Sequence, residues 1–357
     1  PYPEELAANT NVLICPGANL KFVGRFFYFF WVLLLVGRAR YRSGRKGGDG
    51  PLLLVTTHQP LCIVAGVLAQ RIFRVRWVAD VFDVPALGLE ITQGDRKSLT
   101  RWVCSVPRML LTEVAYRVLK NADLVLCTLV PDALARCRIP TGKVVALTNG
   151  VELRDYPLTL GSDGNGTDAF EVLYVGAVLR IRGANTMLDA CGLLLGRVPG
   201  LRLFLVGPSE PEEREWLDRR VAELGLEAVV SIVGELPHDE VLRLVRKADL
   251  CLFPFPKNYA TEFIYPVKVL EYMGAGRTVI ASDLPGVRRI IEDGRSGILV
   301  EPGNPRALAD AMYDLWKSPE LRGTLAANAR AAAPKFEWDR INWQMLEALH
   351  ILTEERQ

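Results

Sequence analysis

The sequence predicts an α/β protein with two doubly wound parallel-sheet domains, and three observations support this prediction. The chain has 357 residues, 50% of them apolar and 24% charged, a balance typical of a packed globular protein with about two domains. From residue 171 onward, short apolar and β-branched runs alternate with segments of helical periodicity. A weaker form of this alternation runs through the first half. Such alternation is typical of βαβ units, in which helices connect parallel strands.

The second half contains six predicted strands, each a short apolar run that ends at small or polar residues. They are expected near Glu171–Gly176, Leu201–Gly207, Val229–Gly234, Asp249–Pro254, Thr278–Ala281 and Gly297–Val300. Helices are expected near 184–196, 210–224, 238–247, 267–275, 285–293, 305–317 and 320–332. After Pro334, an aromatic-rich amphipathic segment predicts one more helix.

The first half contains five weaker strand predictions. They are expected near Val12–Cys15, Leu52–Thr56, Arg76–Val81, Asp123–Cys127 and Lys143–Leu147, with helices near 61–72, 99–120 and 131–137. The two halves are joined by Asn149-Gly150-Val151 and by a small, polar, Gly-rich stretch at 161–168, which is typical of a linker or surface loop.

Charge and cysteine content exclude several classes of protein. Lys plus Arg (43) and Asp plus Glu (41) nearly balance, so a nucleic-acid or membrane partner would have to be recognised by a local patch. The seven cysteines are widely spaced without a C-x-x-C pair, and only three histidines exist. This pattern predicts reduced, buried thiols in a cytoplasmic protein and argues against a zinc site.

A basic and aromatic segment at residues 21–46 is the clearest local patch. Eleven consecutive apolar residues at 26–36 are flanked by seven lysines and arginines, with no acid between 21 and 46. A membrane-spanning helix needs about 20 apolar residues, so this run is too short to cross a bilayer. Two interpretations remain: a buried helix followed by a solvated basic loop, or a surface that inserts aromatic side chains into an anionic membrane.

Three predicted strands of the second half end in Val-Gly, with glycines Gly176, Gly207 and Gly234. Ligands of open parallel sheets bind beyond the carboxyl ends of the strands, and glycine there lets backbone amides approach a phosphate closely. Glycine after a strand also has purely structural roles. The three glycines therefore indicate a candidate ligand edge without identifying the ligand.

The loop after Gly176 carries two arginines, Arg180 and Arg182, just before a predicted helix. Guanidinium groups beside a helix N-terminus suit a diphosphate, although exposed arginines on a solvated loop are the ordinary alternative. The sequence contains no G-x-G-x-x-G and no P-loop motif, which argues against dinucleotide oxidoreductases and P-loop enzymes.

The stretch 261–282 is the richest in candidate chemistry. Pro266 suits a first helical turn, whose free amides form an anion seat. Lys268 and Glu271 stand three residues apart, so they share one face of the predicted helix. The two side chains either pair with each other or face a ligand.

Several ordered motifs resemble the retaining GT-B glycosyltransferases of family 4, over about residues 120 to 345. They are V-G-A-V-L-R-I-R-G (175–183), L-F-L-V-G (203–207), V-G-E-L-P (233–237), K-A-D-L-C-L-F-P (247–254), P-V-K-V-L-E-Y-M-G-A-G-R-T-V-I-A-S-D-L-P-G-V (266–287) and I-E-D-G-R-S-G-I-L-V (291–300). The resemblance implies two Rossmann-like domains facing a cleft, the first apparently lacking its N-terminal βα unit. Residues 1–150 would form the acceptor-side domain, 151–333 the nucleotide-sugar domain, and 334–357 a helix crossing back to the N-terminal domain.

The resemblance also implies the donor site. Glu271 would accept hydrogen bonds from the ribose hydroxyls of a nucleotide sugar. Arg180 and Arg182 would neutralise the diphosphate with help from Lys268. The other donor-binding candidates are Gly176, Gly207, Gly234, Glu235, Glu262, Tyr265, Pro266 and Val267.

Two features of this site concern the sugar and the metal. The family typically carries two glutamates separated by seven residues, and the first of them contacts the donor sugar. In this sequence Phe263 stands eight positions before Glu271, and Glu262 is the nearest acid. The sequence contains no D-x-D pair, and arginines with helix dipoles would stabilise the leaving diphosphate instead. We therefore expect no metal and no cofactor other than the nucleotide-sugar co-substrate.

On the acceptor side, His58 follows one predicted strand and Asp83 follows the next. Asp83 matches the place of a polar cleft residue in the family, so it is preferred to Asp80. His58 is either an acceptor-side hydrogen-bonding group or a structural histidine. The family's front-face mechanism needs no protein nucleophile.

Together these motifs predict a retaining hexosyltransferase that moves a sugar from a UDP- or GDP-linked donor to a lipid-linked or polysaccharide acceptor. The enzyme is expected in the cytoplasm, peripheral at the cytosolic membrane face, with no nucleic-acid partner. Two alternatives remain: a GT-B nucleotide-sugar epimerase and a non-catalytic GT-B subunit.

Overall fold

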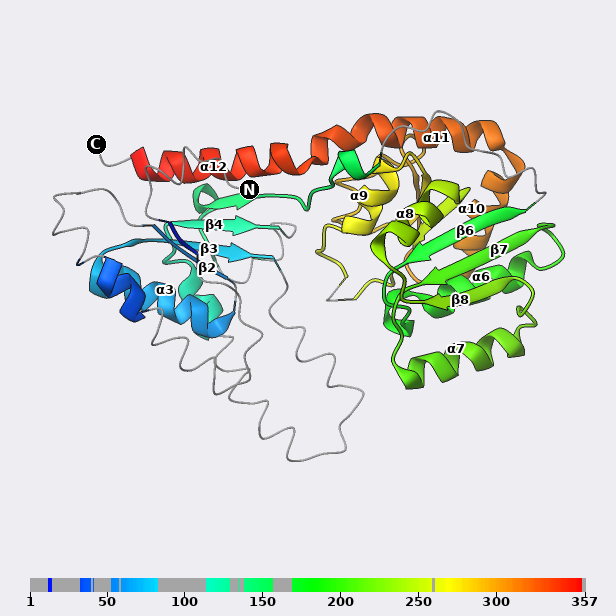
Figure 1. The fold of residues 1–357 in the computed structure, drawn as a ribbon, viewed down its shortest axis with the longest axis horizontal. Helices are drawn as coiled ribbons and strands as arrows, with labels where there is room; N and C mark the ends of the chain where they lie inside the picture. Colours follow the sequence, from blue (N-terminus) through cyan, green and yellow to red (C-terminus); the bar gives the residue numbers. More distant parts are fainter. Residues whose placement is uncertain are drawn as a thin grey trace. The chain divides into compact units, whose positions relative to one another are not determined.

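The computed structural model describes residues 12–14, 33–39, 41, 53–57, 59–82, 114–128, 134, 138–156, 169–258 and 261–354 (Figure 1). The chain divides into two compact units. Unit 1 comprises residues 1–148 and 342–357, and unit 2 comprises residues 149–341. The predicted divisions at 150 and 333 differ from these by two and eight residues, because residues 334–341 pack with unit 2.

Unit 1 contains a parallel sheet whose described strands follow one another in chain order, β1-β2-β3-β4-β5. They are β1 (Val12–Ile14), β2 (Leu53–Thr57), β3 (Arg76–Val81), β4 (Leu124–Cys127) and β5 (Val144–Ala146), with α3 (Pro60–Phe73) connecting β2 to β3. The side chains of β4 are all buried, as expected for a strand covered on both faces.

The core of unit 1 is organised around Trp77 of β3. Its ring is fully buried, and its indole N–H donates to Thr56 Oγ1 at 2.8 Å. Gly66 of α3 gives the ring its space, since a Cβ there would lie 2.2 Å from it. α12 (Trp338–Glu354) returns to this unit, where Arg76 donates to the carbonyl of Leu352.

Unit 2 is a doubly wound sheet of order β11-β10-β9-β6-β7-β8, with every pair parallel. Its strands are β6 (Phe170–Val175), β7 (Leu201–Val206), β8 (Val230–Gly234), β9 (Leu250–Phe253), β10 (Thr278–Ser282) and β11 (Ile298–Val300). Its helices are α6 (Ala184–Leu194), α7 (Pro211–Glu223), α8 (His238–Lys247), α9 (Val267–Gly274), α10 (Pro305–Lys317) and α11 (Pro319–Ala332). The order in which successive strands are added to the sheet reverses between β6 and β9. Open parallel sheets bind their ligands at such a position.

Among the described residues, three short 3-10 segments lie in unit 2 and one lies in unit 1. They are η4 (Leu153–Asp155), η5 (Arg180–Arg182) and η6 (Ala333–Phe336) in unit 2, and η3 (Thr141–Lys143) in unit 1. All six strands predicted for residues 171–300 are confirmed, which fixes where the predicted donor residues lie.

The helix predicted at 285–293 is wrong, because residues 285–290 form successive turns. Gly286 lies against the carbonyl of Ile264, where a Cβ would come within 1.8 Å of the oxygen. The chain therefore lies directly against the backbone of Ile264 at this point, in turns and not in a helix. The helix predicted at 131–137 falls mostly outside the described residues, and of the one at 99–120 the structure describes only the part from 114.

Candidate functional site: the carboxyl edge of the unit 2 sheet

Gly176, Gly207 and Gly234 lie side by side at the carboxyl ends of β6, β7 and β8. The N–H of Gly176 donates to the carbonyl of Val206 at 2.9 Å, and that of Gly207 donates to the carbonyl of Gly234 at 2.8 Å. A Cβ on Gly207 would lie 2.1 Å from the carbonyl oxygen of Gly176. This close backbone approach requires glycine at position 207, so the edge stays free of side chains there.

The loop from Gly176 to α6 is closed by η5 and ends at Gly183. Gly183 has a φ of 90°, and a Cβ on it would lie 2.2 Å from the carbonyl oxygen of Pro254. The N–H of Gly183 donates to the carbonyl of Arg180 at 3.0 Å, which closes the turn. The two arginines of the loop are thereby fixed between the ends of β6 and β9.

Arg180 is bound to Glu213 of α7. Its Nε and Nη2 donate to Oε1 at 3.0 and 2.8 Å, and its backbone N–H donates to Oε2 at 3.0 Å. The guanidinium also lies 5.2 Å from the ring centroid of Trp216. Burial opposes ionisation of Glu213, but the hydrogen bonds from Arg180 outweigh it and hold the pKa of this carboxyl below its usual value. The charge of Arg180 is therefore already balanced.

Arg182 is the second cation of the loop, and it is exposed. Its guanidinium lies 5.7 Å from the ring centroid of Phe255, which stacks on Phe253 at 4.0 Å. Within the described part of the chain, Arg182 forms no ion pair. Of the two predicted diphosphate ligands, Arg182 is the one with an uncompensated charge.

α9 presents the predicted pair Lys268 and Glu271 on one face. Lys268 Nζ lies 2.8 Å from Glu271 Oε2, and the side chains are 34% and 16% exposed. Helix α9 begins at Val267, with Pro266 as its N-cap residue. The lysine thus shields a carboxylate that remains open to solvent on one side.

Tyr272, a residue that the sequence did not single out, attaches α9 to β6. Its fully buried hydroxyl accepts a hydrogen bond from the N–H of Val175 at 2.9 Å. Burial raises the pKa of this phenol well above its usual value, so the hydroxyl stays protonated. Val175 directly precedes Gly176, so this bond places Glu271 and the glycine edge in one rigid arrangement.

The remaining donor candidates have different environments. Tyr265 is buried, and its carbonyl accepts from Asn149 Nδ2 at 2.6 Å. Glu262 pairs with Lys257 at 3.1 Å, so its carboxylate belongs to the turn before α9. Glu235 is exposed next to Gly234, and its side chain has no ion pair within the described ranges.

The acceptor-side candidates His58 and Asp83 lie outside the described residues. Asp80, which was ranked below Asp83, lies in β3 opposite Thr57 of β2. Burial raises the pKa of Asp80 to about 6. Thr57 Oγ1 is also buried, without a hydrogen-bond partner among the described residues.

Glu213 and Tyr272 are the two site residues that the sequence did not reveal. Glu213 follows Pro211 in the first turn of α7, where acids are common for electrostatic reasons alone. Tyr272 stands within the apolar face of a helix, where an aromatic residue is usually only core. Each is recognised through a partner more than 30 residues away, Arg180 in one case and Val175 in the other.

The described residues contain no group of three or more His, Cys, Asp or Glu side chains that could hold a metal ion.

Part of the chain matches a known protein family. Residues 169–318 match the family model described as "Glycosyl transferases group 1". The D-inositol 3-phosphate glycosyltransferase of Corynebacterium urealyticum is 23% identical over 312 residues, which cover 82% of this chain and 70% of that protein. The alpha-D-kanosaminyltransferase of Streptomyces kanamyceticus is 31% identical over 160 residues, covering 44% of this chain and 39% of that protein. Several relatives are thus matched over only about two fifths of their length.

Among solved structures, Anabaena HepE in complex with UDP superposes with a TM-score of 0.69 at 20% sequence identity. The superposition covers 89% of this chain and 82% of that one, and it supports the GT-B fold. Residues 169–318 are thus similar to the group 1 glycosyl transferases, and the superposition shows the GT-B fold.

Proposed function

We propose that the protein is a retaining hexosyltransferase of family 4, which transfers a hexose from a UDP- or GDP-linked donor to an acceptor hydroxyl. The observation that carries this proposal is the hydrogen bond between Tyr272 and Val175, which fixes α9 against the glycine edge. The carboxylate of Glu271, the unpaired guanidinium of Arg182 and the glycine edge then lie together at the carboxyl end of the unit 2 sheet. This combination suits a ribose, a diphosphate and a closely approaching phosphate chain.

Each residue has a distinct part in donor binding. Glu271 accepts hydrogen bonds from the ribose hydroxyls, with Lys268 orienting its carboxylate. Arg182 forms hydrogen bonds with the diphosphate, since its charge is not balanced by a neighbour. The related HepE was solved with UDP, which supports a uridine nucleotide as the first donor to test.

The reaction replaces the bond between the sugar and the diphosphate by a bond to the acceptor oxygen. The leaving diphosphate takes up negative charge, which Arg182 and the N-terminal amides of α9 stabilise without a metal ion. The acceptor oxygen attacks the face of the sugar that the diphosphate leaves, and the departing phosphate takes up the acceptor proton, so the anomeric configuration is retained. The acceptor is a lipid-linked or polysaccharide hydroxyl.

The decisive experiment is Glu271→Gln, which keeps the shape of the side chain and removes its charge. Loss of charge-assisted hydrogen bonds worth about 1.5 to 3 kcal/mol each predicts UDP or GDP binding weaker by about tenfold or more. Calorimetry measures binding, and a transfer assay measures turnover. Glu227→Gln, an exposed glutamate of the same unit, is the control. Unchanged binding in Glu271→Gln would refute the donor site.

The same assays separate the alternatives. An altered sugar after incubation with donor alone would indicate an epimerase. Absence of binding to both UDP and GDP would indicate a non-catalytic subunit.

We also propose that unit 1 touches an anionic membrane at the cytosolic face. Helical residues 33–39 pack their Val36 side against the core formed with α3, and Leu34 on the other side is 71% exposed. Tyr41, one turn beyond Gly37, is 63% exposed, and Ile72 near the end of α3 is 60% exposed. Apolar side chains facing outward beside cations are typical of interfacial surfaces.

Exposed arginines lie within a few residues of these side chains in the sequence, namely Arg38, Arg71 and Arg74. A Cβ added to Gly37 would lie 3.1 Å from the ring of Phe73. Helical residues 33–39 therefore lie next to the end of α3. Among the described helices, none is long and apolar enough to cross a membrane. Flotation with liposomes tests the proposal: binding that requires anionic lipid and falls in Leu34→Ser/Ile72→Ser supports it, and equal flotation without anionic lipid contradicts it.

A further inference from the structure

A hydrogen bond from Asn149 to Tyr265 joins two segments of unit 2 that are 116 residues apart in the chain. Asn149 Nδ2 donates to the carbonyl oxygen of Tyr265 at 2.6 Å. Asn149 is the residue at which the chain enters unit 2, and Tyr265 comes two residues before the first residue of α9. The bond therefore connects the entry of unit 2 with the helix that carries Glu271.

The backbone next to Asn149 is fixed by its own hydrogen bonds. The N–H of Val151 donates to the carbonyl of Phe336 at 2.8 Å, and the carbonyl of Val151 accepts from the N–H of Trp338 at 3.3 Å. Gly150 is buried against the Trp338 indole, since a Cβ there would lie 2.4 Å from the ring. The half-buried side chain of Asn149 thus extends from a segment with little freedom to move.

The carbonyl that accepts this bond belongs to the peptide unit between Tyr265 and Pro266. A peptide unit is planar, and the proline ring restricts its own φ, which is −77° here. Once the carbonyl is oriented, only the ψ angle of Pro266 remains to set the direction of the next N–H group. Asn149 therefore orients the backbone from which α9 begins.

The first amides of α9 are open. Within the described ranges, the first N–H of this helix with a partner is that of Val269, which donates to the carbonyl of Pro266 at 3.2 Å. The preceding N–H groups belong to Val267 and Lys268. Open amides at the start of a helix favour the binding of an anion, and phosphate groups are common ligands there.

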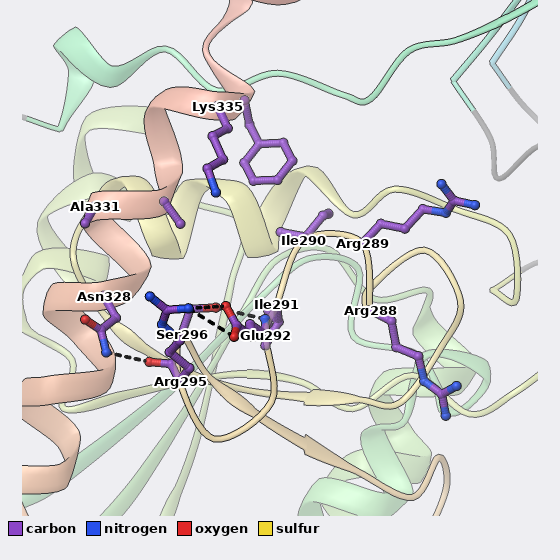
Figure 2. A pocket seen from close by; sticks show the side chains of 12 residues that line it. Arg288, Arg289, Ile290, Ile291, Glu292, Arg295, Ser296, Asn328, Ala331 and Lys335 are labelled. Atoms are coloured by element: carbon purple, nitrogen blue, oxygen red, sulfur yellow. Dashed lines mark hydrogen bonds and ion pairs between the residues drawn. The ribbon is translucent and has the colours of Figure 1, made fainter.

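The segment before α9 is also supported by the turns that follow β10. Gly286 lies so close to the carbonyl of Ile264 that a Cβ would come within 1.8 Å of the oxygen. These turns and α11 line a pocket of about 400 Å³ (Figure 2). Asn328 of α11 donates from Nδ2 to the carbonyl of Arg295 at 2.9 Å, a bond drawn in Figure 2. The support is therefore itself anchored to a helix.

The residue type at position 149 suits this role for an electrostatic reason. A carbonyl oxygen carries partial negative charge, which opposes the binding of an anion at neighbouring N–H groups. The side-chain amide of Asn149 donates to the Tyr265 carbonyl and offsets this charge without adding a net charge of its own. A carboxylate at the same place could not donate, and its negative charge would lie beside the carbonyl oxygen.

We propose that Asn149 is a positioning residue for the diphosphate of the nucleotide donor. It holds the Tyr265–Pro266 peptide unit so that the open amides of Val267 and Lys268 meet the phosphate oxygens. This inference rests on the proposed function and deepens it, because it assigns part of the diphosphate affinity to a side chain that does not touch the donor. The nucleoside part of the donor gains nothing from Asn149.

Calorimetry of the full-length protein tests this, with UDP and uridine as the two probes and uridine measured by displacement of UDP. Asn149→Ala removes the donated hydrogen bond, so UDP affinity should fall by about three- to tenfold. Asn149→Asp should lower it by about tenfold or more. Uridine affinity should stay the same in both variants, because uridine has no phosphate. GDP and guanosine replace this pair if the wild-type protein prefers GDP.

The matched controls are Asn342→Ala and Asn342→Asp, at an exposed asparagine of α12, and both should bind UDP as the wild type does. Unchanged UDP affinity in the Asn149 variants would overturn the inference and leave the donor site intact. Equal losses of UDP and uridine affinity would also overturn it, since they would indicate general damage to the fold. A wild-type protein that binds neither UDP nor GDP would instead refute the proposed function, and this inference with it.

Discussion

The buried hydroxyl of Tyr272 accepts the N–H of Val175 at 2.9 Å, and this bond joins α9, the helix of the proposed donor site, to the strand that leads into the glycine edge. Tyr272→Phe leaves that N–H buried without a partner. The free energy of unfolding is expected to fall by about 1 to 3 kcal/mol. UDP affinity should fall as well, because α9 is no longer held to β6.

Urea denaturation and calorimetry measure these two effects. Tyr313→Phe is the control, since the Tyr313 ring packs against Trp316 and its hydroxyl has no hydrogen bond within the described residues. A Tyr272→Phe protein with unchanged stability and unchanged UDP affinity would contradict the role assigned to this bond.

The two arginines of the loop should differ in their effects, although the sequence predicted the same part for both. Arg182→Gln removes the uncompensated charge, so UDP affinity should fall by about tenfold or more, whereas the free energy of unfolding without nucleotide should stay unchanged. Arg180→Gln breaks the contacts with Glu213 and should mainly loosen the loop. Calorimetry on both variants checks this, and equal losses of affinity would show that Arg180 also binds the donor.

Gly207 should tolerate no side chain. Gly207→Ala places a Cβ against the carbonyl of Gly176, at a φ of 140°, so the free energy of unfolding should fall by about 2 kcal/mol or more. Gly323→Ala in α11 is the control: a Cβ there has open space, and it should stabilise the helix by about 0.5 to 1 kcal/mol. Chemical denaturation measures both, and a neutral Gly207→Ala would disprove the close approach.

Asp80 makes stability depend on pH. The pKa of the Asp80 carboxyl is near 3.8 in the unfolded chain and about 6 in the folded protein, where the group is buried. The folded protein therefore keeps this proton up to a higher pH than the unfolded chain does. The free energy of unfolding therefore falls as pH rises from about 4 to about 6, and it stays lower above that. Asp80→Asn should raise it by up to about 3 kcal/mol above pH 7, and by about half as much at pH 5.

Urea denaturation at both pH values tests this expectation. Asp310→Asn, an exposed aspartate of α10, should show no such pH-dependent gain. A gain in Asp80→Asn that is the same at pH 5 and pH 7.5 would rule out the buried carboxyl as its origin.

The strands of unit 2 were predictable because their apolar runs are short and interrupted by Gly or Pro, so only a buried strand fits them. The segment 285–293 misled because Val287, Ile290 and Ile291 are spaced as on a helix face. All three are buried, but by successive turns, which satisfy the same spacing. Periodicity reports which side chains point inward and does not distinguish a helix from a series of turns.

The candidate site was predictable as a set of residues and not as a set of partners. Lys268 and Glu271 are close in sequence, so their pairing followed from helical spacing. Arg180 and Glu213 are 33 residues apart, and only the packing of α7 beside the loop brings them together. Long-range pairs of this kind depend on tertiary geometry, which local patterns do not contain.

Val151 forms one hydrogen bond with each side of residue 337: its N–H donates to the carbonyl of Phe336 at 2.8 Å, and its carbonyl accepts from Trp338 at 3.3 Å. The segment where the chain enters unit 2 and the segment where it leaves are therefore hydrogen-bonded to each other. A unit with adjoining ends can be exchanged between relatives as a cassette, since only one junction has to be matched. Recombination at this junction offers a direct route to enzymes that combine the sheet edge of one relative with the unit 1 of another.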